Sequence, residues 1–245
     1  MILEMQNHLL RRVAADSGVI STFAGNGTAG FRGDGGPAKE AQFRDPHSIT
    51  YDERDNLYVS DLSNHRVRRI DAGTGRIETI LGNGQRALPQ EGGLAREQPF
   101  LTPQGLAVKG NSLWIASVSG HSVWRLNLKT GRIHRVAGTG RRGRTGDGGD
   151  PLDATLDGPR GMMRSASGVL YVAEGESNVI RALDPARWWI HTIAGVGADP
   201  HRYAGDGVPA TAAPIWQPHG ICAGDDGALI FSDTKNHRVR LLLPL

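Results

Sequence analysis

The chain has 245 residues, of which 34 are glycine and 13 proline, with a formal net charge of +3 and one cysteine, Cys222. So much glycine and proline excludes an architecture of long helices, and a small net charge does not demand a polyanionic partner. One cysteine excludes an internal disulfide and a zinc site built from several thiolates. The sequence shows neither a membrane-spanning apolar run nor a signal segment, so we expect no membrane partner and assign no compartment.

One block of sequence recurs along the chain. Each copy opens on a proline, and the openings at Pro46, Pro103, Pro159 and Pro218 lie 57, 56 and 59 residues apart. A fixed period of this length, filled with short strands, indicates a repeat architecture. Each complete block contains four apolar or β-branched runs separated by Gly, Asp and Asn turns, which predicts four antiparallel strands.

The first complete block shows the pattern in chain order, with runs at Ser48–Tyr51, Leu57–Val59, Val67–Ile70 and Ile77–Leu81. The second run is the most apolar and is expected to be buried on both faces, whereas the third alternates apolar and basic residues and is expected to turn its basic side toward water. A sheet of this kind cannot cover both of its faces alone. Radial stacking of such sheets solves the problem and predicts a β-propeller.

The ends of the chain do not match complete blocks. We expect one domain, 1–245, with blade units at residues 1–25, 46–82, 103–138, 159–195 and 218–245, the first and last incomplete. Three arrangements stay open: a fragment of a six-bladed ring, an imperfectly closed five-bladed ring, or a four-bladed ring in which Ile20–Ala24 completes the last blade. An open arc would expose apolar faces and sheet edges and favour self-association.

Two motifs carry a family resemblance. The sequence Asn-His-Arg-Val-Arg occurs at residues 64–68 and 236–240, each time after a strand ending in Ser-Asp, and Gly33–Ala38 reads Gly-Asp-Gly-Gly-Pro-Ala. These motifs resemble the bacterial form of the NHL repeat. The resemblance implies an NHL-type β-propeller, usually of six blades. It implies no single activity, because the family includes lyases, RNA-binding modules, protein-interaction platforms and extracellular sensor parts.

The residue after each opening proline is the first candidate for a ligand site, because the first strand of each blade lines a propeller's channel. These residues are His47, Gln104, Arg160 and His219. They favour a mouth that binds a polar ligand. The resemblance also suggests zinc-assisted catalysis by His47 and His219, since the family's amidating lyases use channel histidines on zinc. Catalytic zinc generally needs three protein ligands, however, and Arg160 would repel a cation, so no zinc is expected.

Other repeated polar residues are interpreted as parts of the blade itself. The histidines before the third strands, and the acids that end the second strands, are expected to make local hydrogen bonds; they are His8, His65, His121, His237, Glu4, Asp61, Glu174 and Asp233. The turn residues Asp34, Asp147 and Asp206 could attract calcium. A calcium cage needs six to eight oxygen ligands and each turn offers one carboxylate, so no calcium is expected either.

A basic cluster, Arg141, Arg142 and Arg144, is a candidate surface for RNA or another polyanion, with Arg86 and Arg202 at related connector positions. The favoured interpretation is nevertheless a non-catalytic scaffold that binds a protein or a small polar ligand through its loops and channel mouth. The alternatives are a lactonase-like or lyase-like enzyme of the channel mouth and, less favoured, RNA binding by the arginine cluster.

Overall fold

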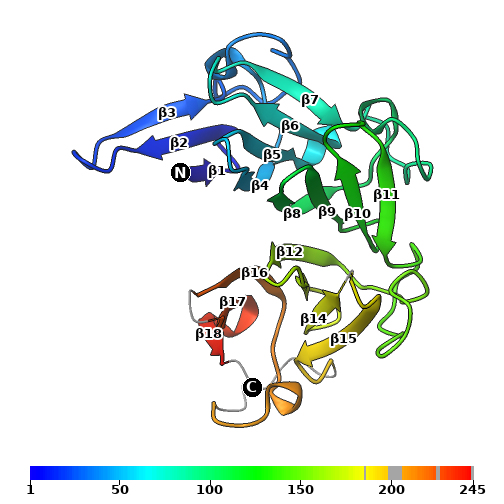
Figure 1. Ribbon diagram of the computed structural model, residues 1–245. Helices are drawn as coiled ribbons and strands as arrows, with labels where there is room; N and C mark the ends of the chain where they lie inside the picture. Colours follow the sequence, from blue (N-terminus) through cyan, green and yellow to red (C-terminus); the bar gives the residue numbers. More distant parts are fainter. Residues whose placement is uncertain (185, 198–205, 225–226, 244–245) are drawn as a thin grey trace. The chain divides into compact units, whose positions relative to one another are not determined.

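The computed structural model describes residues 1–184, 186–197, 206–224 and 227–243. Its eighteen strands form five antiparallel sheets (Figure 1). The first and last sheets have three strands, and the three between them have four. The predicted all-β architecture of five blade units, incomplete at both ends, is therefore confirmed. None of the helices in these segments is long and apolar enough to cross a membrane.

The strands follow the predicted order along the chain and within each sheet. They are β1 (Ile2–Glu4), β2 (Leu9–Val13), β3 (Ile20–Ala24), β4 (Pro46–Tyr51), β5 (Leu57–Asp61), β6 (Arg66–Ile70), β7 (Ile77–Leu81), β8 (Pro103–Lys109), β9 (Ser112–Ser117), β10 (Ser122–Asn127), β11 (Ile133–Ala137), β12 (Pro159–Arg164), β13 (Leu170–Glu174), β14 (Val179–Asp184), β15 (Trp189–Ala194), β16 (Pro218–Ala223), β17 (Leu229–Asp233) and β18 (Arg238–Leu242). Short 3-10 helices lie between them, including η1 (Ala38–Glu40) and η4 (Ala210–Ala212) on the connectors.

The chain divides into two compact units. The first contains residues 1–113 and 126–133, and the second contains residues 114–125 and 134–245. Within the first unit β4 neighbours β8, and within the second unit β12 neighbours β16, so opening strands of successive sheets lie side by side. At Gly161 on β12, an added Cβ would lie 2.0 Å from the carbonyl oxygen of His219 on β16. Glycine is required there because no side chain fits between the two strands.

Each unit has an apolar core between successive sheets. In the first unit Leu10 of the first sheet packs with Leu57, Val59, Ile70 and Ile77 of the second. In the second unit Ile180 and Ala194 of the fourth sheet pack with Phe231 of the fifth. All five residues of β5 are buried, as expected for the most apolar strand. Burying large aliphatic side chains on this scale is the main force that holds neighbouring sheets together.

The expectation that the third strand turns its basic side toward water is wrong for two arginines. Arg68 on β6 is 0% exposed and Arg181 on β14 is 1% exposed. A guanidinium tolerates such burial only when charged partners and hydrogen-bond acceptors surround it. The local alternation of the strand could not reveal those partners, because they come from distant segments.

The four-bladed alternative is also wrong. Strand β3 pairs with β2, with Leu10 opposite Ala24 and Val13 opposite Ile20. The segment Ile20–Ala24 therefore completes the first sheet and does not belong to the last one. Whether the five blade units belong to a six-bladed ring or to an imperfectly closed five-bladed one stays a prediction.

Candidate functional site

In the first unit, the structure brings two of the predicted channel-mouth residues together. The side chains of His47 and Gln104, which follow the opening prolines of β4 and β8, place their Nε2 atoms 3.3 Å apart. This distance is that of a hydrogen bond, and its direction depends on the tautomer of the His47 ring. Gln104 is buried and His47 is half-buried. The pair therefore holds the imidazole in a fixed orientation.

In the second unit, Arg160 and His219 lie on the neighbouring strands β12 and β16. The Arg160 guanidinium donates to the Glu176 carboxylate. The backbone N–H of His219 donates to Ser232 Oγ over 3.2 Å. Because Glu176 balances the charge of Arg160, the expected repulsion of a cation by Arg160 loses much of its force.

In each of three sheets, an arginine of the third strand connects two carboxylates. In the second sheet, Arg68 lies 2.6 Å from Asp34 Oδ1 and 3.4 Å from Asp61 Oδ2. Asp61 also accepts the backbone N–H of Arg44 and the Asn64 side-chain amide, each over 2.8 Å. Burial raises the pKa of Asp61 to about 6, although these donors and Arg68 oppose that rise. The carboxylate that ends β5 thus ties a connector, a turn and a neighbouring strand together.

The same arrangement recurs in the second unit. Arg181 lies 2.6 Å from Asp147 Oδ1 and 3.7 Å from Glu174 Oε1, and Glu174 also accepts the Ser177 hydroxyl over 2.8 Å. Burial raises the pKa of Glu174 to about 7. In the last sheet Arg240 makes the equivalent contacts with Asp206 at 3.1 Å and Asp233 at 3.4 Å.

The strand-ending acids and the turn aspartates both have partners within the blades. The acids that end the second strands do accept bonds from the following turn, as predicted, through Asn64, Ser177 and Asn236. The turn aspartates considered for calcium are ion-pair partners of the buried arginines. Within the described part of the chain, no three His, Cys, Asp or Glu side chains gather as metal ligands would.

Sequence analysis missed these arginines, although a signal was present. The third sheet carries Trp124 where the others carry arginine, its second strand ends in Ser117, and the preceding connector reads Glu91-Gly92-Gly93 without the turn aspartate. In the sheets that a connector precedes, the arginine, the strand-ending acid and the turn aspartate are therefore present together, except in the third sheet, where Trp124, Ser117 and Glu91 take their places. Such a shared presence indicates that the three side chains depend on one another.

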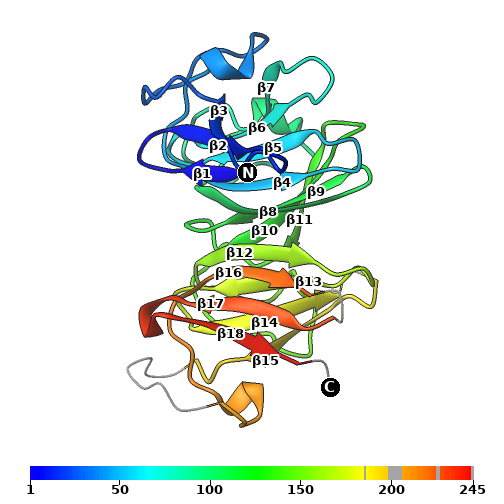
Figure 2. The ribbon, with the colours of Figure 1, turned by 90° about the vertical axis from the view of Figure 1, so that its left-hand side faces the viewer.

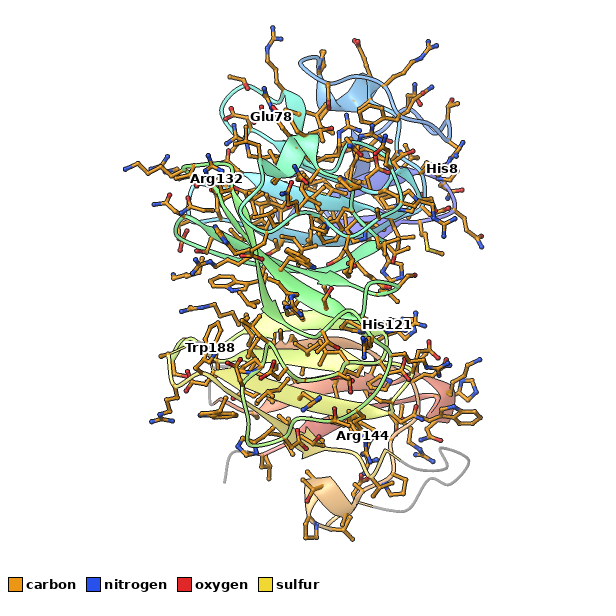
Figure 3. All side chains as sticks on the ribbon, turned by 90° about the vertical axis from the view of Figure 1, so that its right-hand side faces the viewer. His8, Glu78, His121, Arg132, Arg144 and Trp188 are labelled. Carbon is orange, nitrogen blue, oxygen red and sulfur yellow. The ribbon has the colours of Figure 1, made fainter. Side chains whose placement is uncertain are left out.

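Two of the repeated histidines before the third strands have a structural role, but their bonds reach the segment before the next sheet and do not stay within their own blade. Nδ1 of His8 accepts the backbone N–H of Asp45, and Nδ1 of His121, labelled in Figure 3, accepts that of Gly158, each over 3.4 Å. In the fourth sheet Asn178 takes this place and accepts the N–H of Gln217 over 2.9 Å. Each acceptor holds the residue before the next opening proline. The acceptors themselves adopt left-handed backbone, with φ between 43° and 57°.

The arginine cluster lies on an exposed connector of the second unit. Arg142 Nε lies 2.9 Å from Asp157 Oδ2, so its charge is paired. Arg144, labelled in Figure 3, donates to the carbonyl of Val196 over 3.1 Å, which leaves its charge uncompensated by that contact. Arg86 is exposed in the first unit, and Arg202 lies outside the described residues. The cluster therefore presents less positive charge than its sequence suggests.

An apolar groove of the second unit was not predicted from the sequence. It has a volume of about 1070 Å³ and lies between the fourth and fifth sheets, and its walls include Tyr171, Trp189, Ile193, Ile215 and Phe231. None of the four channel-mouth candidates lines it. Periodicity within a single strand could not reveal a groove whose walls come from two different sheets.

Comparison with known families agrees with the motifs and the fold. The model of the NHL repeat matches residues 43–70 and 216–240, which include the first and last Asn-His-Arg motifs. Together with the five sheets, this match defines the class: the chain is an NHL-repeat β-propeller protein.

The curated proteins that are similar to this chain are much longer than it. Protein SUPPRESSOR OF QUENCHING 1, chloroplastic, from Arabidopsis thaliana is 28% identical over 92% of this chain, which spans 22% of that protein. NHL repeat-containing protein 2 from Bos taurus is 25% identical over 98% of this chain, which spans 37% of it. The chain thus spans well under half of the length of these relatives.

Solved structures share the fold at low sequence identity. An auxiliary nutrient binding protein from Bacteroides ovatus has a TM-score of 0.61 and 16% identity, with 96% of this chain and 64% of that chain covered. A gluconolactonase from Xanthomonas campestris has a TM-score of 0.57 and 12% identity, covering 94% and 63%. Virginiamycin B lyase from Staphylococcus aureus has a TM-score of 0.53 and 17% identity, covering 98% and 64%. Binding proteins and enzymes thus share this architecture.

Proposed function

We propose that this NHL-repeat propeller is a non-catalytic scaffold that binds a protein or a small polar ligand through its loops and channel mouth. One comparison between repeats carries the proposal. A position that holds the blade together keeps its chemistry in most sheets, as Arg68, Arg181 and Arg240 show, with Trp124 as the exception. The positions after the opening prolines change instead, from His47 to Gln104, Arg160 and His219.

This variation shows that the common blade structure does not fix the side chains at these four positions. Four different polar side chains at equivalent positions, held in fixed orientation, are suited to recognising a polar ligand. The His47–Gln104 contact supplies such an orientation. The likeness to a nutrient binding protein supports the binding role at the level of the fold.

Ligand-induced thermal stabilisation tests the proposal. Wild-type protein would be heated with a panel of sugars, sugar acids and short polar peptides, beside variants His47→Phe and Arg160→Met. We expect at least one compound to raise the wild-type Tm and to lose that effect in a variant, because binding to the folded state stabilises it. His191→Phe, an exposed position on β15, is the matched control. Equal shifts in all four proteins would refute a site at the channel mouth.

The alternative of a channel-mouth enzyme draws support from the likeness to a gluconolactonase and a lyase. It requires His47 and His219 to act on substrate, and its metal-assisted form also requires bound zinc or calcium. Metal analysis of purified protein and a lactone-hydrolysis assay test it together. Near-stoichiometric metal and turnover, both lost in the His47→Ala/His219→Ala double variant but kept in His191→Ala, would favour the enzyme.

RNA binding by the arginine cluster is the less supported alternative, because Asp157 already pairs with Arg142. Filter binding of a single-stranded RNA at rising salt is the appropriate measurement. Retention at low salt that weakens steeply with salt and disappears when Arg141, Arg142 and Arg144 are changed to glutamine would support it.

A further inference from the structure

The backbone around the opening proline is the same in the second, fourth and fifth sheets. In each, the N–H two residues after the strand-ending acid donates to the carbonyl two residues before the proline. These bonds run from Ser63 to Arg44, from Glu176 to Asp157 and from Lys235 to Trp216. The residue directly before the proline has left-handed backbone in all three, with φ between 47° and 62°. The side chains on this common frame can therefore be compared position by position.

The fourth sheet carries two glycines where the other sheets carry side chains. Gly158 stands before the opening proline, where the equivalents are Asp45, Thr102 and Gln217. Gly175 follows the strand-ending acid, where the equivalents are Leu62, Val118 and Thr234. A Cβ added at Gly158 would lie 2.6 Å from Cγ of Glu176. One added at Gly175 would collide with Cδ and Nε of Arg160. Each glycine therefore leaves the space that one charged side chain occupies.

The fourth sheet uses this space to join Glu176 to Arg160. In the second sheet the position of Glu176 is taken by Ser63, whose hydroxyl donates to Asp45 Oδ2 over 2.7 Å and so ties one turn to another. In the fourth sheet Glu176 passes over Gly158 and accepts the guanidinium of Arg160 instead. A bond between turns thus gives way to one that fixes the side chain after the opening proline.

Stability alone does not account for this set of four residues. An ion pair that is open to solvent adds little to stability, and the side chains of Arg160 and Glu176 are 21% and 35% exposed. The two glycines carry a cost of their own, because glycine loses more conformational freedom on folding than any other residue. The set is better explained by the need to hold a guanidinium and a carboxylate in one fixed arrangement.

This arrangement places hydrogen-bond donors beside an acceptor. Nε of Arg160 is buried, so the Nη groups are the donors that a ligand can reach, and the carboxylate of Glu176 has a second oxygen that can accept. The two opposite charges largely cancel at longer range, so that the pair attracts neither an anion nor a cation strongly. It suits a neutral group that accepts from one side chain and donates to the other. Two neighbouring hydroxyl groups of a sugar have this property.

An extended peptide fits this place less well than a sugar does. Such a peptide binds by adding a strand to a free sheet edge. Strand β12 pairs with β13 on one side, and Figure 2 shows β12 beside β16. An added Cβ at Gly161 would collide with the carbonyl oxygen of His219, so no further strand enters between β12 and β16.

We propose that Arg160 and Glu176 form a binding site for a neutral sugar. One sugar hydroxyl accepts a hydrogen bond from the Arg160 guanidinium, and a neighbouring hydroxyl donates to the Glu176 carboxylate. Gly158 and Gly175 are positioning residues, since they leave the space in which the pair forms. This inference rests on the proposed function, because it names the class of ligand for the part of the channel mouth that Arg160 contributes.

Isothermal titration of the full chain tests the site, with methyl glycosides of glucose, mannose and galactose, with glucuronate, and with a short polar peptide. We expect the wild type to bind a glycoside and Glu176→Gln to bind it about tenfold more weakly, because a hydrogen bond to a charged group is lost. The same variant should gain affinity for glucuronate, because the charge of Arg160 is no longer balanced. Gly175→Ala keeps both charges but displaces the guanidinium, so it should weaken glycoside binding without that gain.

Glu53→Gln is the matched control, since it removes the carboxylate of another exposed ion pair, which joins Glu53 to Lys109 at 2.9 Å in the first unit. It should bind like the wild type. If Glu176→Gln does not fold, Glu176→Ser takes its place, with the side chain that the second and third sheets carry.

Two results would overturn the sugar site: a wild type that binds none of the glycosides, or a Glu176→Gln variant that binds them as the wild type does. Binding of glucuronate or peptide that is lost in His47→Phe would then leave the general channel-mouth site standing. If the wild type binds no member of the panel, the general proposal fails together with the sugar site.

Discussion

Arg181 and Glu174 face each other across two neighbouring strands of the fourth sheet, with 3.7 Å between Arg181 Nη1 and Glu174 Oε1. Both side chains are almost fully removed from solvent. Asp147 holds the other side of the same guanidinium from a connector. The contact therefore couples the interior of a sheet to the placement of an exposed loop, and its removal should affect both stability and loop geometry.

The first prediction concerns pH. Burial raises the pKa of Glu174 to about 7 and that of Asp61 to about 6, whereas unfolded carboxyls titrate near about 4. The folded state then binds more protons than the unfolded state between these values. The stabilisation of the folded state by both carboxyl groups is fully present below about pH 4 and is lost as the pH rises toward about 7.

The pH dependence that His65 contributes to stability has the opposite sign, because burial and the nearby Arg86 and Arg66 lower its pKa. The comparison of wild type with Glu174→Gln isolates the glutamate. We expect the free energy of unfolding of the variant to rise relative to that of wild type as the pH increases from 5 to 8, as measured by urea denaturation. Glu78→Gln, at an exposed position, is the control. A difference that is constant over this range would contradict the raised pKa.

The second prediction is that Arg68→Met destabilises the protein by about 3–5 kcal/mol, because it leaves Asp61 buried without its charged partner. Arg69→Met, at the next and half-exposed position, should cost less than about 1 kcal/mol. Chemical denaturation measures both. Similar costs for the two substitutions would show that the buried contacts of Arg68 do not stabilise the sheet.

The third prediction uses the third sheet, where Trp124 stands in place of the arginine. Trp124 is 3% exposed, and the equivalent strand-ending residue, Ser117, is uncharged. Trp124→Arg should lower the Tm strongly, since it buries a charge beside the uncharged Ser117 and removes a large apolar side chain. Ser117→Asp added to Trp124→Arg should recover part of the loss. If the double variant is no more stable than the single one, the three side chains do not act as a set.

The fourth prediction concerns the left-handed backbone and the hydrogen bond at His121. Its φ of 43° is left-handed, and Asn178 adopts φ 57° at the equivalent place. Asparagine tolerates this region and can accept the same backbone bond, so His121→Asn should be nearly neutral. His121→Ala should cost about 1–2 kcal/mol through backbone strain and a lost acceptor. The difference in thermal unfolding between the two variants provides the measurement.

Much of the fold could be predicted from short-range patterns. The spacing of Pro46, Pro103 and Pro159 identified the repeat, and the alternation of short apolar runs with Gly and Asp turns identified the strands. The place of Met1–Glu4 in this pattern also predicted the incomplete first sheet. These features are local, because strand formation and turn geometry depend mainly on neighbouring residues.

The sequence by itself thus determined the class of fold, its five sheets and its two incomplete ends. Only the tertiary structure decided that Arg68 is buried, since its partner Asp34 lies 34 residues away in the chain. The apolar groove lined by Trp189 was likewise decided in three dimensions. Burial and ion pairing depend on which sheet faces lie next to each other, and no property of a single strand encodes that.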